Sequence, residues 1–283
     1  MKLTKYFLIA LVAITMASCG EEEPSSTFTR DFTMIYPQHA AGHKMISKIE
    51  RKYTNGALSV ATANYDGDHL KSINVVNRDK NGDLLSEETI HYDYNNGAIF
   101  CDKSIQDVTY SFEVNSFGSI TRLKNETTSR TAASLAYSNN NEIEIAQIVS
   151  PSSSDVTKVV WDNGKLMNWV STGVNKKDSV AYEYGEGAPL NKGGIDIVAN
   201  DSFTFTVFVC AIMRNAGLFG ATSAYLPTAF KKAIDYSMEG GGSQTEDPQL
   251  KRYDISYVLD SEGYVKSYTT NESPTYSVTF TYR

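Results

Sequence analysis

Hydrophobic and polar residues alternate with a period of two along most of the chain beyond residue 45. The alternating stretches are rich in Tyr, Thr, Val and Ile, and Asn, Asp and Gly interrupt them. A side-chain period of two is typical of β-strands that present one face to a core and the other to water. The pattern therefore predicts many short strands joined by tight turns.

A loose repeat organises these strands. In each copy an aromatic or aliphatic residue ends one strand, a turn rich in Asp, Asn and Gly follows, and an aliphatic residue opens the next strand. The copies are 65–68 before Leu70, 94–97 before Ile99, 112–118 before Ile120, 137–141 before Ile143, 161–164 before Leu166 and 259–263 before Val265. Asn, Asp and Gly tolerate the positive φ that tight hairpins require. Each copy is therefore expected to supply two strands and two turns.

Strands joined by such short turns must be antiparallel neighbours. The sequence thus predicts an all-β fold, a large antiparallel meander of roughly 12 to 16 strands. So many strands twist too much to remain a flat open sheet, so we expect a barrel-like or strongly curved sheet. A sandwich of two sheets is the alternative layout.

The segment near 203–237 breaks the alternation and predicts a short helical insert. Residues 203–213 form an unbroken apolar run, which indicates either a buried strand or a helix that ends near Gly217. Pro227, followed by Phe230, Ala233 and Ile234 at helical spacing, predicts a second short helix over 228–237. The meander is expected to resume at Arg252 and to end in a strand over 276–282.

The first eighteen residues have the features of a secretory signal. Lys2 and Lys5 precede an uncharged apolar stretch, and the small residues Ala17 and Ser18 lead directly to Cys19. A cysteine at this position is typical of a bacterial lipobox and predicts that Cys19 carries a lipid after cleavage. We therefore expect a signal peptide over 1–18, a lipidated cysteine and linker over 19–44, and a single antiparallel β domain over 45–283.

The expected location is that of an outer-membrane lipoprotein, on the cell surface or the periplasmic face. The membrane would be a partner through the N-terminal lipid alone, because strands such as 71–74 and 176–179 are polar on both faces, unlike those of a membrane-spanning barrel. The formal net charge of −7 excludes the positive footprint that nucleic-acid binding needs.

The lipobox, the acidic residues 21–23, the hairpin repeat and the segment 217–220 before 225–227 together resemble domain-of-unknown-function family 4595. Members are Bacteroidetes lipoproteins with a porin-like β fold, and the resemblance covers roughly 45–283. It implies that fold and a place in the cell envelope, and it supplies no catalytic residues. The hairpins are also distantly similar to YD repeats.

One segment is a near match to a calcium-binding loop. Its oxygen-bearing residues are Asn77, Asp79, Asn81, Asp83 and Glu88. A loop of this type lies between two helices, whereas both flanks of this segment alternate like strands. A plain hairpin turn is therefore the better interpretation, and no metal is expected.

Trp161 and Trp169 are weak candidates for a sugar-binding surface, because aromatic faces stack on sugar rings. If 163–164 is a two-residue turn, Trp161 pairs with Leu166 and the two indoles point to opposite faces of the sheet. Only a bulge that shifts the register would bring them to one face.

Cys101 and Cys210 are the two cysteines that remain after Cys19. Exported proteins can form disulfides, so a bridge between them is possible. Both also lie in apolar sequence, which suits buried free thiols equally well.

The function predicted from these features is a non-enzymatic binding module for a glycan or another cell-surface ligand. The alternatives are a structural or envelope-assembly protein that pairs with another protein through an exposed strand edge, and a hydrolase. The sequence contains no nucleophile elbow, no paired-cysteine zinc spacing and no phosphate-binding loop, so an enzyme is the weaker alternative and no cofactor is expected.

Overall fold

The computed structural model describes residues 43–95, 98–103, 108–149, 154–172, 177–195, 207–235, 250–272 and 275–283. The predicted signal peptide, the lipid-attachment residue Cys19 and nearly all of the linker lie outside these residues.

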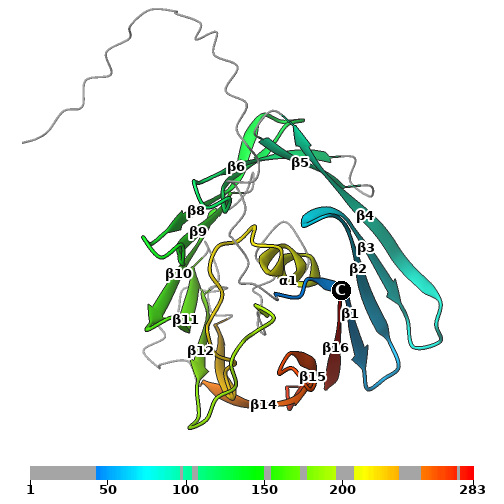
Figure 1. The fold of residues 1–283 in the computed structure, drawn as a ribbon, viewed down its shortest axis with the longest axis vertical. Helices are drawn as coiled ribbons and strands as arrows, with labels where there is room; N and C mark the ends of the chain where they lie inside the picture. Colours follow the sequence, from blue (N-terminus) through cyan, green and yellow to red (C-terminus); the bar gives the residue numbers. More distant parts are fainter. Residues whose placement is uncertain are drawn as a thin grey trace, which may run out of the picture.

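Sixteen antiparallel strands in the described residues form a closed barrel (Figure 1). Each strand pairs with its neighbour in sequence, and β1 closes the barrel against β16. The strands are β1 (Ile46–Tyr53), β2 (Leu58–Asp66), β3 (His69–Arg78), β4 (Leu84–Asn95), β5 (Ala98–Lys103), β6 (Val108–Val114), β7 (Ile120–Asn125), β8 (Arg130–Tyr137), β9 (Ile143–Val149), β10 (Ser154–Asp162), β11 (Lys165–Thr172), β12 (Lys177–Glu183), β13 (Ala229–Asp235), β14 (Lys251–Leu259), β15 (Val265–Thr270) and β16 (Tyr276–Tyr282). The predicted meander is confirmed in its barrel form, and the sandwich alternative is wrong.

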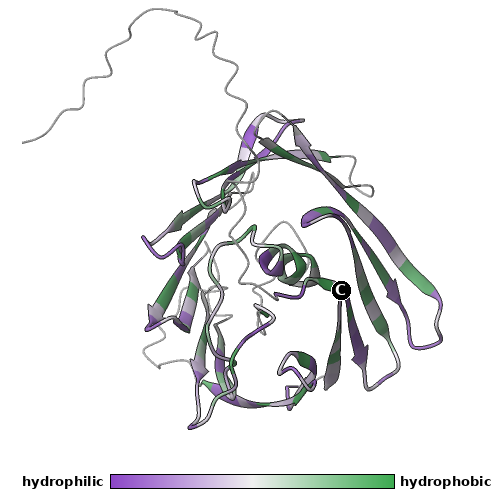
Figure 2. Cartoon of the chain, in the orientation of Figure 1, coloured by the Kyte–Doolittle hydropathy of each residue, from purple (hydrophilic) through white to green (hydrophobic). Residues whose placement is uncertain are grey.

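The turns form where the repeat places them. Between β10 and β11, Asn163 and Gly164 both have positive φ, at 49° and 72°, as a tight two-residue hairpin turn requires. Along the strands on either side of such turns, hydrophobic and hydrophilic residues follow one another in short succession (Figure 2). In β3, for example, Leu70, Ile73 and Val75 are buried, whereas Lys71 is exposed. The core therefore lies inside the barrel.

The connection between β12 and β13 carries the helix α1 (Val207–Asn215), which lies inside the ring of strands (Figure 1). The helical interpretation of the apolar run is thus confirmed. Residues Val209 to Met213 are all buried, so the run is apolar because barrel and helix bury each other. With nine residues, α1 is too short to cross a bilayer. Among the described residues, no helix is both long enough and apolar enough to do so.

The predicted helix over 228–237 is wrong, because this segment contains strand β13. It pairs with β12 along its whole length, from Ala229 opposite Glu183 to Asp235 opposite Lys177. The helical spacing was misleading: Phe230 faces inward, and Lys231 and Lys232 point to opposite faces, as in a strand. Ladder hydrogen bonds to β12 and β14 override a weak local preference for helix.

The segment that follows α1 is bonded to the hairpin turns at one end of the barrel. Ile120 donates to the Leu218 carbonyl at 2.8 Å, Ala221 to that of Asn141 at 2.7 Å, and Ala224 to that of Gly164 at 2.8 Å. Together with α1, this segment forms a plug, which we define as residues 207–228. The plug covers the barrel end where the chain enters β1 and leaves β16.

Asn215, at the end of α1, joins the plug to the N-terminal entry of the barrel. Its buried side chain accepts a hydrogen bond from the Ile46 N–H at 2.7 Å and donates to the Gly193 carbonyl at 2.7 Å. The His43 ring also lies 3.2 Å from the Asn215 carbonyl oxygen. The chain therefore meets the plug before its first strand begins.

A ring of aromatic side chains surrounds the plugged end. Each donates a hydrogen bond of 2.6 to 3.0 Å to a backbone carbonyl at the start of the preceding strand or, for Tyr257, just before it. This girdle consists of Tyr65, Tyr94, Tyr137, Trp161, Tyr184, Tyr257 and Tyr282, bonded in turn to Ile46, Leu70, Ile120, Ile143, Leu166, Pro227 and Val265. Four of the donors, Tyr65, Tyr94, Tyr137 and Trp161, are aromatic positions of the repeat. Leu70, Ile120, Ile143, Leu166 and Val265 among the acceptors are its aliphatic positions. The repeat therefore supplies part of the girdle.

Candidate functional site

The barrel has two unlike ends on its inner face. The girdle end is plugged and apolar, whereas the opposite end, which we call the loop end, carries inward-facing polar residues. Their inward direction follows from their pairing with buried residues, as Arg51 pairs with Val278 and Lys232 with Val180. The inward polar positions toward the loop end include Arg51, Ser59, Asn77, Glu88, Asp155, Ser171, Lys232 and Thr270.

The densest group of these side chains lies where β1 and β16 close the barrel. We call it the seam cluster, and it comprises Arg51, Tyr53, Lys232, Thr270, Glu272 and Tyr276. The Arg51 guanidinium lies 4.6 Å from the ring centroid of Tyr276 and 5.9 Å from that of Tyr53, and Arg51 also donates to the Tyr53 hydroxyl at 3.3 Å. The two rings meet edge to face at 6.0 Å. Cation–π contact of this kind holds a guanidinium in place within an apolar wall.

Two further features make the seam cluster polar as well as aromatic. Burial raises the pKa of the Tyr276 phenol, and the positive charge of Arg51 partly opposes this rise. Thr270 is 4% exposed. Its hydroxyl lies beside the Tyr276 phenol and opposes the rise in the pKa of that group, although the two groups are not aligned as a regular hydrogen bond. A buried hydroxyl in this position is a group that a bound polar molecule can satisfy.

Lys232 and Glu272 form an ion pair of 3.2 Å beside these residues. Their side chains are 30% and 21% exposed, so solvent screens the pair only in part. The seam cluster therefore holds two cations, one carboxylate, two tyrosine rings and a buried hydroxyl. This combination is suited to binding a polar molecule, and it contains no nucleophile paired with a base.

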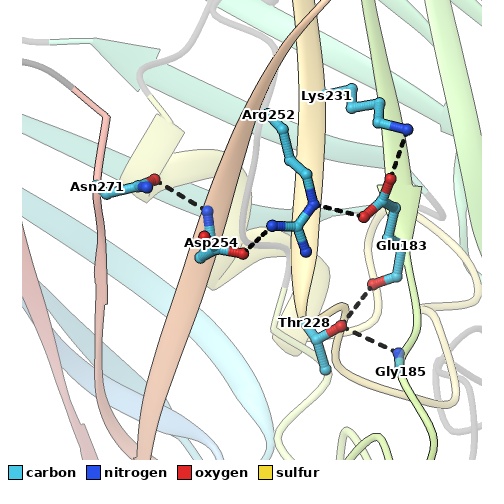
Figure 3. Close-up of polar contacts among 7 residues, drawn as sticks. All are labelled: Glu183, Gly185, Thr228, Lys231, Arg252, Asp254 and Asn271. Carbon is cyan, nitrogen blue, oxygen red and sulfur yellow. Dashed lines mark hydrogen bonds and ion pairs between the residues drawn. The ribbon is translucent and has the colours of Figure 1, made fainter.

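The outer face of β12, β13 and β14 is organised differently (Figure 3). Lys231 and Arg252 both bind the Glu183 carboxylate, at 2.7 and 2.8 Å, and Arg252 also pairs with Asp254. The hydrogen bonds from Lys231 and from Arg252 lower the pKa of Glu183. These outer charges thus satisfy one another on the surface.

The calcium-loop candidates fall in the hairpin between β3 and β4. Asp79 Oδ1 accepts hydrogen bonds from the backbone N–H groups of Asn81 and Asp83, at 2.8 and 2.9 Å, so it anchors the turn. Asn77 donates to Ser86 at 2.9 Å within the barrel wall, and Glu88 lies on β4 opposite Val75. The hairpin interpretation is confirmed. Among the described residues, no three or more His, Cys, Asp or Glu side chains gather where they could hold a metal ion.

The two tryptophans lie on the same face of the wall, so the prediction of opposite faces is wrong. Trp161 pairs with Leu166 as expected, but the register shifts after Val160, and Val159 then pairs with Trp169. The bulge turns both indoles inward. Trp161 belongs to the girdle, and Trp169 is 7% exposed in the core. Both indoles therefore pack against the core.

Cys101 and Cys210 are both buried, and no disulfide joins them in this structure. Both are electrostatic neighbours of the Tyr92 phenol, whose pKa burial raises well above its usual value. Cys101 thus lies on the inner wall and Cys210 on α1, in the same region of the core. The disulfide stays a prediction, which thiol titration of the unfolded, unreduced protein tests.

Sequence reasoning did not identify the seam cluster. Its members come from the first strand, the last two strands and β13, and only closure of the barrel brings them together. The sequence did contain one signal of this cluster. Ile49, Arg51 and Tyr53 are every second residue of β1 and so share one face of the strand. An arginine on an otherwise apolar and aromatic face indicates an inward cation.

No family model and no curated protein matches the chain. A crystal structure of a porin-like protein from Bacteroides uniformis superposes with a TM-score of 0.63 at 15% sequence identity, over 84% of this chain and 98% of that protein. A porin-like protein from Bacteroides vulgatus gives a TM-score of 0.49 at 14% identity, over 85% and 99% of the respective chains. The first of these likenesses supports the porin-like fold that the family resemblance implied, and at such identity it concerns the fold alone. Membership of the family stays a prediction.

Proposed function

We propose that this chain is a lipid-anchored cell-envelope protein that binds a polar ligand, of the glycan class, with inward-facing side chains at the loop end of its barrel. The observation that carries the proposal is the seam cluster, where tyrosine rings, cations and a buried hydroxyl face the same interior. Binding sites for small polar molecules combine aromatic walls with a few polar groups in this way.

The charged residues on the outer face of the barrel support a location in water beside a membrane rather than within the bilayer. Outward positions on β1 are Lys48, Glu50 and Lys52, and those on β14 include Arg252 and Asp254. A lipid-facing barrel wall needs a continuous apolar band. Attachment through Cys19 would then supply the membrane affinity, with a place at the outer membrane as predicted.

The assembly alternative loses its main support. Pairing with another protein through a strand edge needs an unpaired edge, and β1 and β16 pair with each other along seven register positions. The described barrel therefore offers no terminal strand for augmentation.

The anchor is tested by metabolic labelling with palmitate. Wild-type chain is expected to incorporate the label and to partition into detergent, whereas Cys19→Ala is expected to do neither. Label retained by the variant would contradict the anchor.

Ligand binding is tested by probing a glycan array with wild-type protein, Tyr276→Leu and Ser277→Ala. Tyr276 faces inward and packs against the core, and its neighbour Ser277 faces outward opposite Lys52 and Thr269. We expect Ser277→Ala to retain the wild-type signals and Tyr276→Leu to lose them. A blank array for the wild type, or equal signals for both variants, would count against binding at the loop end.

A further inference from the structure

We propose that Asn163 is a site of spontaneous deamidation, and that this modification releases the plug from the hairpin between β10 and β11. Water is the only co-reactant. The backbone nitrogen of Gly164 attacks the side-chain carbonyl carbon of Asn163, and the amide nitrogen leaves as ammonia, which gives a cyclic imide. Water then opens the imide to aspartate or to isoaspartate, in which the backbone runs through the former side-chain carbonyl.

The described residues contain three Asn–Gly pairs, each in a hairpin turn: Asn55–Gly56, Asn81–Gly82 and Asn163–Gly164. Glycine is the neighbour that favours this attack, because it has no Cβ to crowd its backbone nitrogen. All three asparagines are exposed, so water reaches each of them. Sequence and exposure therefore do not distinguish one site from the others.

The hydrogen bonds of the three glycine N–H groups do distinguish them. Gly56 and Gly82 each donate to the backbone carbonyl three residues earlier, at 2.9 and 3.1 Å. Gly164 donates no hydrogen bond to any described residue. A nitrogen attacks only after its N–H has been released, and one backbone hydrogen bond is strong enough to slow that step about fivefold. The nucleophile is thus available in the folded protein at Asn163 alone among these sites.

The asparagine side chains differ in the same direction. The side-chain oxygen of Asn55 accepts a hydrogen bond from the Ala57 N–H at 3.0 Å, which holds this amide within its turn. The Asn163 amide nitrogen donates to the Asp162 carboxylate at 2.8 Å, and both of these side chains are exposed. Water readily replaces a hydrogen bond at the surface, so the Asn163 amide is the easier one to reorient toward the attacking nitrogen.

The modified bond lies directly before a contact that holds the plug. The Gly164 carbonyl accepts the 2.8 Å hydrogen bond from the Ala224 N–H, and the Ser223 hydroxyl lies 3.0 Å from that of Tyr184 beside it. Isoaspartate adds a methylene group to the backbone between residues 163 and 164. A two-residue turn has no spare length to absorb it, so the Gly164 carbonyl moves away from the plug.

The first experiment compares the three sites in one molecule. Peptide mass spectrometry follows deamidation of the full mature chain during incubation in mildly alkaline buffer, with and without urea. In urea we expect the three rates to agree within about twofold, because each asparagine precedes a glycine. In the folded protein we expect Asn163 to react about fivefold faster than Asn55 or Asn81. Equal rates at the three sites of the folded protein, or an Asn163 that reacts only in urea, would overturn the proposal.

Hydrogen exchange at the Ala224 amide tests release of the plug. Incubation should speed this exchange about fivefold in the isoaspartate fraction of the wild type. Asn163→Gly is the matched control, since it tolerates the positive φ and has no amide to lose, and its exchange should not change with incubation. Asn163→Asp carries the new charge without the added methylene and should exchange as slowly as fresh wild type. Faster exchange in incubated Asn163→Gly, or unchanged exchange in the isoaspartate fraction, would overturn release of the plug.

Circular dichroism checks that Asn163→Gly and Asn163→Asp fold like the wild type. Fresh wild-type protein provides the same comparison without any substitution, because its own isoaspartate fraction forms during the incubation.

Discussion

Gly220 shows how a single backbone position lets the plug fit the barrel. Its φ is +76°, and a Cβ there would lie 2.4 Å from the Asn141 carbonyl oxygen and 2.7 Å from the Tyr137 ring. The next residue, Ala221, donates the hydrogen bond that ties the plug to this turn. The sequence shows a glycine, but the close approach that requires it arises only after the chain has folded.

Gly220→Ala is therefore expected to destabilise the barrel by at least about 2 kcal/mol, from positive φ and steric overlap together. Gly187 is a matched control, because it has the same φ of +76° and open space around its Cβ position. Gly187→Ala should cost about 1 kcal/mol, from backbone strain alone. Urea unfolding followed by circular dichroism measures both, and equal losses would mean that the Gly220 contact does not matter.

At the scale of elements, the repeat predicted the hairpins and their turns because both depend on neighbouring residues. The same repeat contains some of the donors and acceptors of the girdle, such as Tyr137 and Ile120, but which carbonyl each aromatic reaches depends on strand pairing. Strand β13 and the position of Trp169 were mispredicted for the same reason. Backbone hydrogen bonds from β12 and β14 hold β13 as a strand, and a one-residue bulge in β11 turns Trp169 inward. Both depend on pairing between strands, which a local sequence pattern does not reveal.

The girdle makes a prediction about hydrogen bonds between elements. Tyr137→Phe removes the 2.6 Å bond to the Ile120 carbonyl and leaves the ring in place. We expect a loss of about 1 kcal/mol in the free energy of unfolding. Tyr225→Phe is the control, because the Tyr225 hydroxyl bonds no described residue, and it should change stability by less than about 0.5 kcal/mol. Indistinguishable unfolding midpoints for the two variants would show that the girdle bond does not stabilise the barrel.

At the scale of the whole molecule, closure of the barrel brings together residues whose proximity the sequence could not show. The strand count and the antiparallel order follow from turn spacing, whereas the pairing of β1 with β16 joins the two ends of the domain. The seam cluster, the inward turn of Arg51 and the burial of Thr270 all depend on that pairing. The sequence accordingly predicted a class of fold and a class of function, and the candidate site required the closed barrel.

The buried tyrosines predict that the barrel unfolds in alkali. Burial raises the pKa of Tyr65, Tyr137, Tyr257 and Tyr282 above that of the unfolded chain, so the folded state retains protons that the unfolded state releases. The contribution of these tyrosines to stability is thus fully present below about pH 10 and is lost as the pH rises further. Near-ultraviolet absorbance of tyrosinate should rise together with loss of the β spectrum. Complete tyrosine ionisation in a protein that remains folded would contradict this.

The central claim is that the barrel packs its inner face and exposes its outer face to water, and cysteine labelling tests it most directly. Single cysteines are placed at four neighbouring pairs on the full lipidated chain carrying Cys101→Ala and Cys210→Ala, reconstituted on vesicles. The outward positions are Asn64, Lys158, Asp254 and Thr279, and their inward neighbours are Ala63, Thr157, Ile255 and Val278. We predict that a charged maleimide labels all four outward positions and none of the inward ones. Protection of the outward positions by the bilayer, or labelling without alternation, would contradict the account.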